Sequence, residues 1–335
     1  MEKEMTGPVE VAENLWTFAI ELPRNPLKSL NCYVVKDPAG GRELLVDTGF
    51  FFPECTQPLM HGIEQLGLRP ENTDVFLTHI HSDHVGNAAY LEKQGFRIVM
   101  GALDYDLICM GSKQRWDETD RVMRLEGMPD EIIDAARNRD SAIPDTSGDF
   151  EALKVYNGDV LRYGEYSFEC ILTPGHSPGH MCLFDEKKKT VLLGDHVLFD
   201  ITPNICVWSC MTDSLGMYIN SLHRIRDIDA EIVLPAHRTT GGMTLPERVD
   251  ELLAHHERRL AEAMSIIRTE PGLNSYEIAS RMSWHIKADS WAHFPPNQQF
   301  FAHSETMAHL DRLVHSGLIK REHDANGTSR YFVQS

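Results

Sequence analysis

Residues 75–84 read Val-Phe-Leu-Thr-His-Ile-His-Ser-Asp-His, an apolar run followed directly by three histidines and an aspartate within six positions. The apolar run predicts a buried strand, and the polar residues after it predict the start of a helix. At a strand end His79 and His81 share one face, because side chains alternate with a period of two. Asp83 and His84 can turn back toward the same point from the first turn of the helix. Imidazole and carboxylate are ligands of zinc and similar divalent ions, so this stretch predicts a metal site.

Three more polar residues follow short apolar strands later in the chain. They are His176, Asp195 and His237, each two to four residues after a pair of aliphatic residues. The carboxyl edge of a sheet opens into a crevice in α/β folds, so we expect these side chains to approach the first cluster. Glycines and prolines around His176 permit the tight loop that presents its ring.

Together these motifs resemble those of the metallo-β-lactamase superfamily, whose first motif is His-x-His-x-Asp-His after an apolar strand. The companions occur in the order that the superfamily requires: an early strand-turn motif at residues 45–49, a third-histidine loop at 173–180, a bridging aspartate at 194–196 and a final ligand at 235–237. The resemblance covers about residues 14–240. It implies an α/β fold, a four-layer αββα sandwich.

The resemblance also implies two metal sites that share one aspartate. The ligands would be His79, His81 and His176 for one ion, Asp83, His84 and His237 for the other, and Asp195 as the bridge. Two divalent ions are thus the expected cofactors, with zinc as the first choice and iron or manganese also compatible with nitrogen and oxygen donors. Such a pair lowers the pKa of a shared water toward about 7 and so supplies hydroxide as the nucleophile.

Other residues near these motifs receive supporting roles. Asp83 or Asp195 could carry the proton to the leaving group. The resemblance implies that Asp47 orients a ligand imidazole. We expect His180 and His196 to pack beside the ligands rather than to bind metal.

A bridging aspartate with a final histidine is the pattern of the glyoxalase II, lactonase and nuclease branches, and true β-lactamases lack that aspartate. We therefore expect a metal-dependent hydrolase that cleaves a thioester, lactone or ester of a small molecule. One alternative is a single-strand-specific endoribonuclease, although nuclease relatives usually carry a large domain where only a short gap separates Asp195 from His237. Another is a mononuclear iron persulfide dioxygenase, which shares the first motif but needs one metal.

Residues 102–148 change character and predict a helical insertion. We expect most of its apolar side chains to pack within the insertion. As a hypothesis, it also caps the metal crevice and supplies an apolar acyl pocket through Trp116 and Met123. The insertion belongs to a catalytic domain at residues 1–250, and a second domain follows at 251–335.

The C-terminal domain predicts a winged helix, with short helices followed by two β segments around an Asn-Gly turn. Residues 256–335 hold nine Lys or Arg and nine Asp or Glu, so the domain is neutral. A DNA-binding helix needs a basic face, which the segment 305–316 does not offer. We expect the domain to pack against the catalytic domain or against a second copy in a homodimer.

Composition agrees with a globular enzyme rather than a nucleic-acid binder. The 335 residues include 32 Lys and Arg against 50 Asp and Glu, a formal net charge of -18 that repels phosphate backbones and anionic membranes. RNA is therefore expected as a partner only under the endoribonuclease alternative. Seven cysteines without a Cys-x-x-Cys pair predict free thiols. With no signal peptide and no apolar run near the roughly 20 residues of a membrane helix, we expect a cytoplasmic protein.

Overall fold

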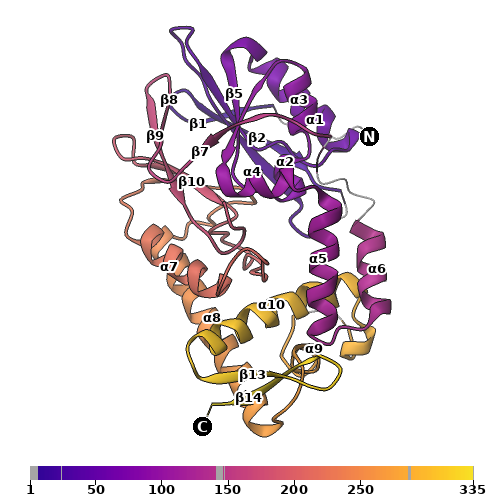
Figure 1. Cartoon of the computed structure of the whole chain (residues 1–335). Coiled ribbons are helices and arrows are strands. Elements are labelled where there is room, and N and C mark those ends of the chain that lie inside the picture. The colour runs from indigo at the N-terminus through magenta and orange to yellow at the C-terminus, as the bar shows by residue number, and fades with distance from the viewer. Residues whose placement is uncertain (1–6, 24, 141–145, 147, 286–287, 335) are drawn as a thin grey trace.

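The computed structural model describes residues 7–23, 25–140, 146, 148–285 and 288–334. In this part of the chain two β-sheets stack face to face, and helices cover their outer sides (Figure 1). The first sheet contains, in spatial order, β1 (Val9–Ala12), β2 (Leu15–Glu21), β3 (Ser29–Val35), β4 (Glu43–Val46), β5 (Thr73–Leu77), β6 (Arg97–Gly101) and β7 (Ala152–Val155). Neighbours from β1 to β4 are antiparallel, and those from β4 to β7 are parallel.

The second sheet has the spatial order β12, β11, β10, β9, β8. Its strands are β8 (Val160–Tyr163), β9 (Tyr166–Leu172), β10 (Met181–Asp185), β11 (Thr190–Gly194) and β12 (Ile232–Pro235). β11 and β12 are parallel, and the other neighbours are antiparallel. Because β9, β11 and β12 all run in one direction, their carboxyl ends lie at one edge of the sheet.

Side chains along β4 point alternately to the two faces of the first sheet, and this alternation shows why the layers form. Leu44 and Val46 point into the core between the sheets, whereas Leu45 points outward under α1 (Pro53–Gln65) and α3 (Ala88–Lys93). On the far side, α7 (Ser214–Arg226) and α8 (Leu245–Thr269) cover the second sheet with residues such as Leu222 and Val249. The order helix, sheet, sheet, helix confirms the predicted αββα sandwich.

The two sheets are tied together at the edge that carries the ligand motifs. The amide of Asn31 in β3 donates to the carbonyl of Ala236 just after β12, at 2.7 Å. The amide of Met181 in β10 donates to the carbonyl of Thr78 just after β5, at 2.9 Å. These bonds bring the carboxyl ends of strands from both sheets to one place.

The predicted insertion divides into two parts with different neighbours. α4 (Ala102–Cys109) packs against the first sheet, where Leu107 joins its outer core. α5 (Ser112–Leu125) and α6 (Asp130–Asp140) extend away from the sheets and reach α10 (Pro296–His315) (Figure 1). Met123 is buried in a cluster with Phe300, and the Trp116 ring lies 6.2 Å from the Phe300 ring. The insertion therefore packs only in part on itself: α5 and α6 supply most of this cluster, α10 adds Phe300 and Met307, and α4 packs on the first sheet.

The C-terminal region holds short helices and a two-stranded hairpin. Its elements are the second half of α8, α9 (Ser275–Ala279), the 3-10 turn Trp291–His293, α10, β13 (Ile319–His323) and β14 (Ser329–Val333). They share a core that includes Ile267, Leu310 and Tyr331. α8 runs without interruption through residue 250, and α10 packs on α7. The winged helix and the division at residues 250 and 251 stay predictions.

Prolines occupy the starts of two helices. α1 begins at Pro53, and Pro58 lies inside it. α10 begins at Pro296, nine residues before the predicted start at Glu305, because Pro296 occupies the first helical position, which proline suits. α8 begins with a capping box formed by Thr244 and Glu247. The short helix α2 (Ser82–Val85) and the 3-10 turn Pro70–Asn72 complete the described elements.

Candidate metal centre

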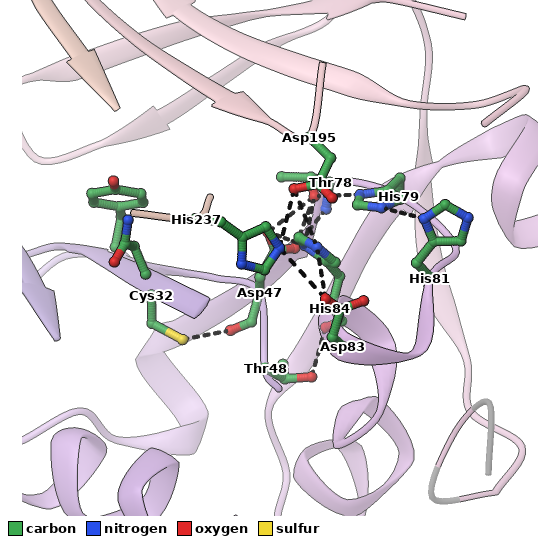
Figure 2. Close-up of polar contacts among 12 residues, drawn as sticks. Cys32, Asp47, Thr48, Thr78, His79, His81, Asp83, His84, Asp195 and His237 are labelled. Carbon is green, nitrogen blue, oxygen red and sulfur yellow. Dashed lines mark hydrogen bonds and ion pairs between the residues drawn. The ribbon is translucent and has the colours of Figure 1, made fainter. Parts of the chain in front are cut away.

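The seven predicted ligand residues meet at the edge where the two sheets are joined, and Figure 2 shows six of them side by side. Three groups of side chains bring one ligand atom each to within 4.8 Å of one another: His79 with His81 and His176, His79 with His84 and Asp195, and Asp83 with His84 and His237. We call the first the His176 site and the third the His237 site. All seven are buried except His81, which is half-buried.

Short distances join the acidic and basic ligands. The Asp195 carboxylate lies 3.2 Å from Nε2 of His237 through Oδ1 and 3.6 Å from Nε2 of His176 through Oδ2. Oδ2 of Asp83 lies 3.4 Å from Nε2 of His237. Within the His176 site, Nε2 of His79 faces Nδ1 of His81 at 2.9 Å. Asp195 thus lies between the two sites, where the predicted bridge belongs.

The donor atoms fit a pair of metal ions. Five ligand atoms are fully buried and have no hydrogen-bond partner among the described residues: Oδ2 of Asp83, Nε2 of His84, Nε2 of His176, Oδ1 of Asp195 and Nε2 of His237. Leaving one buried polar atom unsatisfied costs about 1–3 kcal/mol, so five converging ones need an explanation. Nitrogen and oxygen ligands of divalent ions supply it.

Hydrogen bonds fix the tautomer of three of these histidines. Nδ1 of His84 donates to Oδ2 of Asp47 at 2.8 Å, Nδ1 of His176 donates to the Asn204 carbonyl at 2.8 Å, and Nδ1 of His237 donates to the Ser29 carbonyl at 2.7 Å. With Nδ1 protonated, each Nε2 keeps its lone pair for a metal.

Asp47 organises the first motif, as the resemblance implied. It has a left-handed backbone, with φ of 62°, and its Oδ1 accepts the amide of Thr78 at 2.9 Å. The Thr78 hydroxyl donates to the same carboxylate, so its oxygen can accept from Nδ1 of His79 at 3.0 Å. One carboxylate therefore orients His79 and His84 together.

The charged side chains of the metal centre favour the binding of cations. Burial alone lowers the pKa of a histidine, and it holds the pKa of His79 far below its usual range and that of His81 at about 3. Burial acts in the same direction on His237, but Asp195 and Asp83 outweigh it and raise the pKa of His237 to about 10. The carboxylates thus draw positive charge to the His237 site.

Two further histidines lie behind the ligands. The backbone amide of Asp195 donates to Nε2 of His180 at 3.1 Å, and Nδ1 of His180 lies 2.7 Å from the Thr173 hydroxyl. His196 is buried beside the Tyr218 ring at 5.2 Å. Both occupy packing positions, as expected.

Residue-level prediction missed three contributors to the centre. The carbonyls of Asn204 and Ser29 give no side-chain signal, since any residue could supply them. Trp208 was also missed: its ring stacks 6.2 Å from that of His81, and its Nε1 donates to the His176 carbonyl at 3.3 Å. Trp208 thus lies beside His81, the most exposed of the ligands.

Asp104 is a further contributor that sequence analysis assigned to the insertion. It lies in the first turn of α4, shortly after β6 ends at Gly101, as the ligands lie shortly after their strands, and that position was the available signal. Its carboxylate is fully buried and contacts both loops of the His176 site.

Comparisons with known protein families agree with this geometry. A sequence model described as the metallo-beta-lactamase superfamily matches residues 26–237. A second model, described as the metallo-beta-lactamase-like C-terminal domain, matches residues 293–334. The matched ranges include the metal centre and α10 with its hairpin.

Curated relatives are distant. A Caenorhabditis elegans protein named beta-lactamase-like protein 2 homolog is 22% identical over 89% of this chain and 82% of its own length. An Aspergillus fumigatus protein named atrochrysone carboxyl ACP thioesterase is 25% identical over 80% of this chain and 52% of its own length. The lactamase-like protein adaB of Aspergillus niger is 24% identical over 73% of this chain. The chain spans 52% and 60% of the length of these two Aspergillus relatives.

Solved structures share the fold over almost the whole chain. A metallo-beta-lactamase family protein from Thermus thermophilus superposes with a TM-score of 0.80 at 24% identity, covering 97% of this chain and 100% of that one. A beta-lactamase domain protein from Burkholderia ambifaria gives the same TM-score and identity, covering 97% of this chain and 94% of that one. The likeness includes the C-terminal region as well as the sandwich.

Proposed function

The chain belongs to the metallo-beta-lactamase superfamily, and from this membership we propose that it is a two-metal hydrolase that cleaves an acyl bond, a thioester or a lactone or ester, in a small molecule. The observation that carries the proposal is the set of five buried ligand atoms without hydrogen-bond partners, which converge from strands of both sheets. When bound, the ions would supply Lewis acidity and a water of lowered pKa.

The residues of the chain would hold the ions and transfer the proton. His79, His81 and His176 would hold one ion, and Asp83, His84 and His237 the other, with Asp195 shared. Asp83 would bind its ion through Oδ2, which lies 3.4 Å from Nε2 of His237, and this leaves its second carboxylate oxygen to accept a proton and pass it to a leaving group. We assign this proton transfer to Asp83, because Asp195 directs one oxygen toward His237 and the other toward His176 and would use both on the ions.

Two observations support acyl substrates. Several relatives carry the name atrochrysone carboxyl ACP thioesterase, at 24–25% identity. Trp208 places an aromatic surface beside the most exposed ligand, against which an apolar acyl group can pack. The net charge of -18 also disfavours RNA.

A substrate panel tests the proposal. Zinc-loaded protein is offered acyl-CoA thioesters, glutathione thioesters, homoserine lactones and single-stranded RNA, and each product is quantified. We expect turnover of a thioester or lactone, and a loss of at least about a hundredfold in Asp195→Asn, which removes the shared ligand charge. Asp227→Asn, at an exposed position after α7, is the matched control and should retain full activity.

RNA cleavage with the acyl substrates untouched would overturn the proposal in favour of a nuclease. Oxygen consumption with a persulfide, supported by a single iron per chain, would overturn it in favour of a dioxygenase.

A further inference from the structure

Asp104 connects the two loops that carry the ligands of the His176 site. Its Oδ2 accepts the backbone amide of Ile80 at 2.9 Å and the hydroxyl of Ser177 at 2.6 Å. Its Oδ1 accepts the backbone amide of Gly179. One carboxylate therefore holds three donors from two segments that are almost a hundred residues apart in sequence.

Two of the three donors lie directly beside a ligand. Ile80 stands between His79 and His81, and Ser177 directly follows His176. A shift of the Ile80 amide moves both neighbouring imidazoles, and a shift of Ser177 moves the third. Asp104 thus touches the framework of all three ligands of this site without touching a ligand atom.

The backbone at this corner is built for close approach. A Cβ placed on Gly179 would lie 2.3 Å from the amide nitrogen of Asp104, and one placed on Gly101 would lie 2.5 Å from the Gly179 carbonyl. Real Cβ atoms do not approach this closely, so glycine is required on both sides. The loop after His176 is therefore pressed onto the β6–α4 corner, where the Asp104 carboxylate anchors it.

Burial of this carboxylate has a cost that its hydrogen bonds offset. Asp104 is fully buried, and burial raises its pKa to about 6 while the bonds from Ser177, Gly179 and Ile80 act in the opposite direction. An apolar residue would avoid this cost if the position served only to fill space.

The His237 site uses other supports. Nδ1 of His84 is held by Asp47, and Nδ1 of His237 is held by the Ser29 carbonyl. Neither contact involves Asp104 or its three partners. A change at Asp104 therefore leaves both of these supports in place.

We propose that Asp104 is a positioning residue that clamps the His79–His81 turn to the His176 loop and thereby sets the affinity of the His176 site for its ion. The inference rests on the two-metal centre of the proposed function. It assigns to the His176 site a support that the His237 site does not share.

Metal binding by the stripped chain tests this inference without any substrate. Chelator-treated wild type, Asp104→Ala and Asp104→Asn are titrated with cobalt, and binding is followed by the cobalt absorption spectrum and by metal content after dialysis. We expect one of the two ions to bind about tenfold to a hundredfold more weakly in the Asp104 variants, because supports of metal ligands contribute on that scale. The other ion should keep its wild-type affinity.

Reference variants identify the weakened site. His176→Gln removes a ligand of one site and His237→Gln a ligand of the other, so the spectrum of Asp104→Ala should match that of His176→Gln. Ser177→Ala removes one of the three bonds and should give a smaller loss at the same site. It also keeps the inference testable if Asp104→Ala fails to fold.

Asp74 offers a matched control. It is equally buried and bonds to Arg97 and Tyr163, but it lies near the start of β5, away from the ligand end. Asp74→Asn should lower stability and leave both metal affinities unchanged.

Equal weakening of both ions in Asp104→Ala, no weakening of either, or the same pattern in Asp74→Asn would overturn the inference. Failure of every acyl substrate would refute the proposed function alone, because the metal titration contains no substrate.

Discussion

Thr78 shows how much one side chain decides at the centre. Its hydroxyl joins the Asp47 carboxylate to Nδ1 of His79, and its amide donates to the same carboxylate. The residue before the first ligand thus fixes the tautomer of that ligand. The motif in the sequence located the ligands, but the direction of each ring is set by groups such as this one.

Buried histidines away from the centre make stability depend on pH. His303 is fully buried, its Nε2 lies 2.6 Å from the Ser275 hydroxyl, and burial lowers its pKa to about 3. The unfolded chain binds a proton near pH 6.5, whereas the folded chain does not until about pH 3. The free energy of unfolding should therefore fall as pH decreases through this window, by about 1.4 kcal/mol per pH unit for this histidine.

His303→Gln keeps a donor for Ser275 but cannot titrate. We expect urea denaturation between pH 7 and pH 4 to show a shallower loss of stability in this variant, by about one proton. His223→Gln, at an exposed position, controls for the substitution itself. An unchanged pH slope in His303→Gln would show that His303 is not buried in its neutral form.

At the scale of elements, the segment 203–213, which we call the strap, links the centre to α10. The Asn204 carbonyl accepts from His176, and Trp208 donates to the His176 carbonyl. Val207 packs against the cluster that contains Phe300 and Met123. The strap ends at Asp213, which caps α7 and pairs with Arg312 of α10 at 2.8 Å. Through the strap, the C-terminal helix supports the His176 loop.

Loosening α10 on the strap side should therefore reduce turnover. Phe300→Ala removes a buried ring from the cluster that holds Val207, and Leu313→Ala removes a buried side chain from the opposite, C-terminal core. Both should lose stability, by about 3–5 and about 2–5 kcal/mol. We expect only Phe300→Ala to lower kcat, measured on folded, metal-loaded protein. Equal kcat losses in the two variants would contradict a role for the strap.

The sequence predicted elements where an apolar run and a polar helix start adjoin. β5 and the helix that begins after it were found from the residues alone, because the apolar residues 75–77 come before the polar stretch that opens α2. β1 and β7 were missed, because Val9–Ala12 and Ala152–Val155 are mostly exposed edge strands with little apolar pattern. The partner of the α5–α6 hairpin was missed as well, since an amphipathic helix shows that it needs a partner and not which one.

At the scale of the molecule, the ligand residues were predictable and their supports were not. His79 and His237 follow strands of different sheets, and strand direction places both at one edge. Backbone carbonyls such as those of Ser29 and Asn204 depend on the tertiary path of the chain and leave no trace in residue type. Asp104 carried a signal, its place after β6, but only the packed loops show what it binds.

The two halves of the chain are also joined more closely than their sequences indicate. α8 contributes Val249 to the outer core of the sandwich and Ile267 to the C-terminal core. The C-terminal region also packs on α7 and on the α5–α6 hairpin.

No helix in the described part of the chain is long and apolar enough to cross a membrane.

Metal titration of the stripped enzyme during thioester hydrolysis tests the central claim most directly. Zinc is added to chelator-treated chain in fractions of one equivalent, and the initial rate is recorded after each addition. The two-metal centre predicts no hydrolysis at zero zinc and a rate that rises to a plateau at two ions per chain. Hydrolysis by the stripped chain, a plateau at one ion, or two bound ions without any hydrolysis would contradict it.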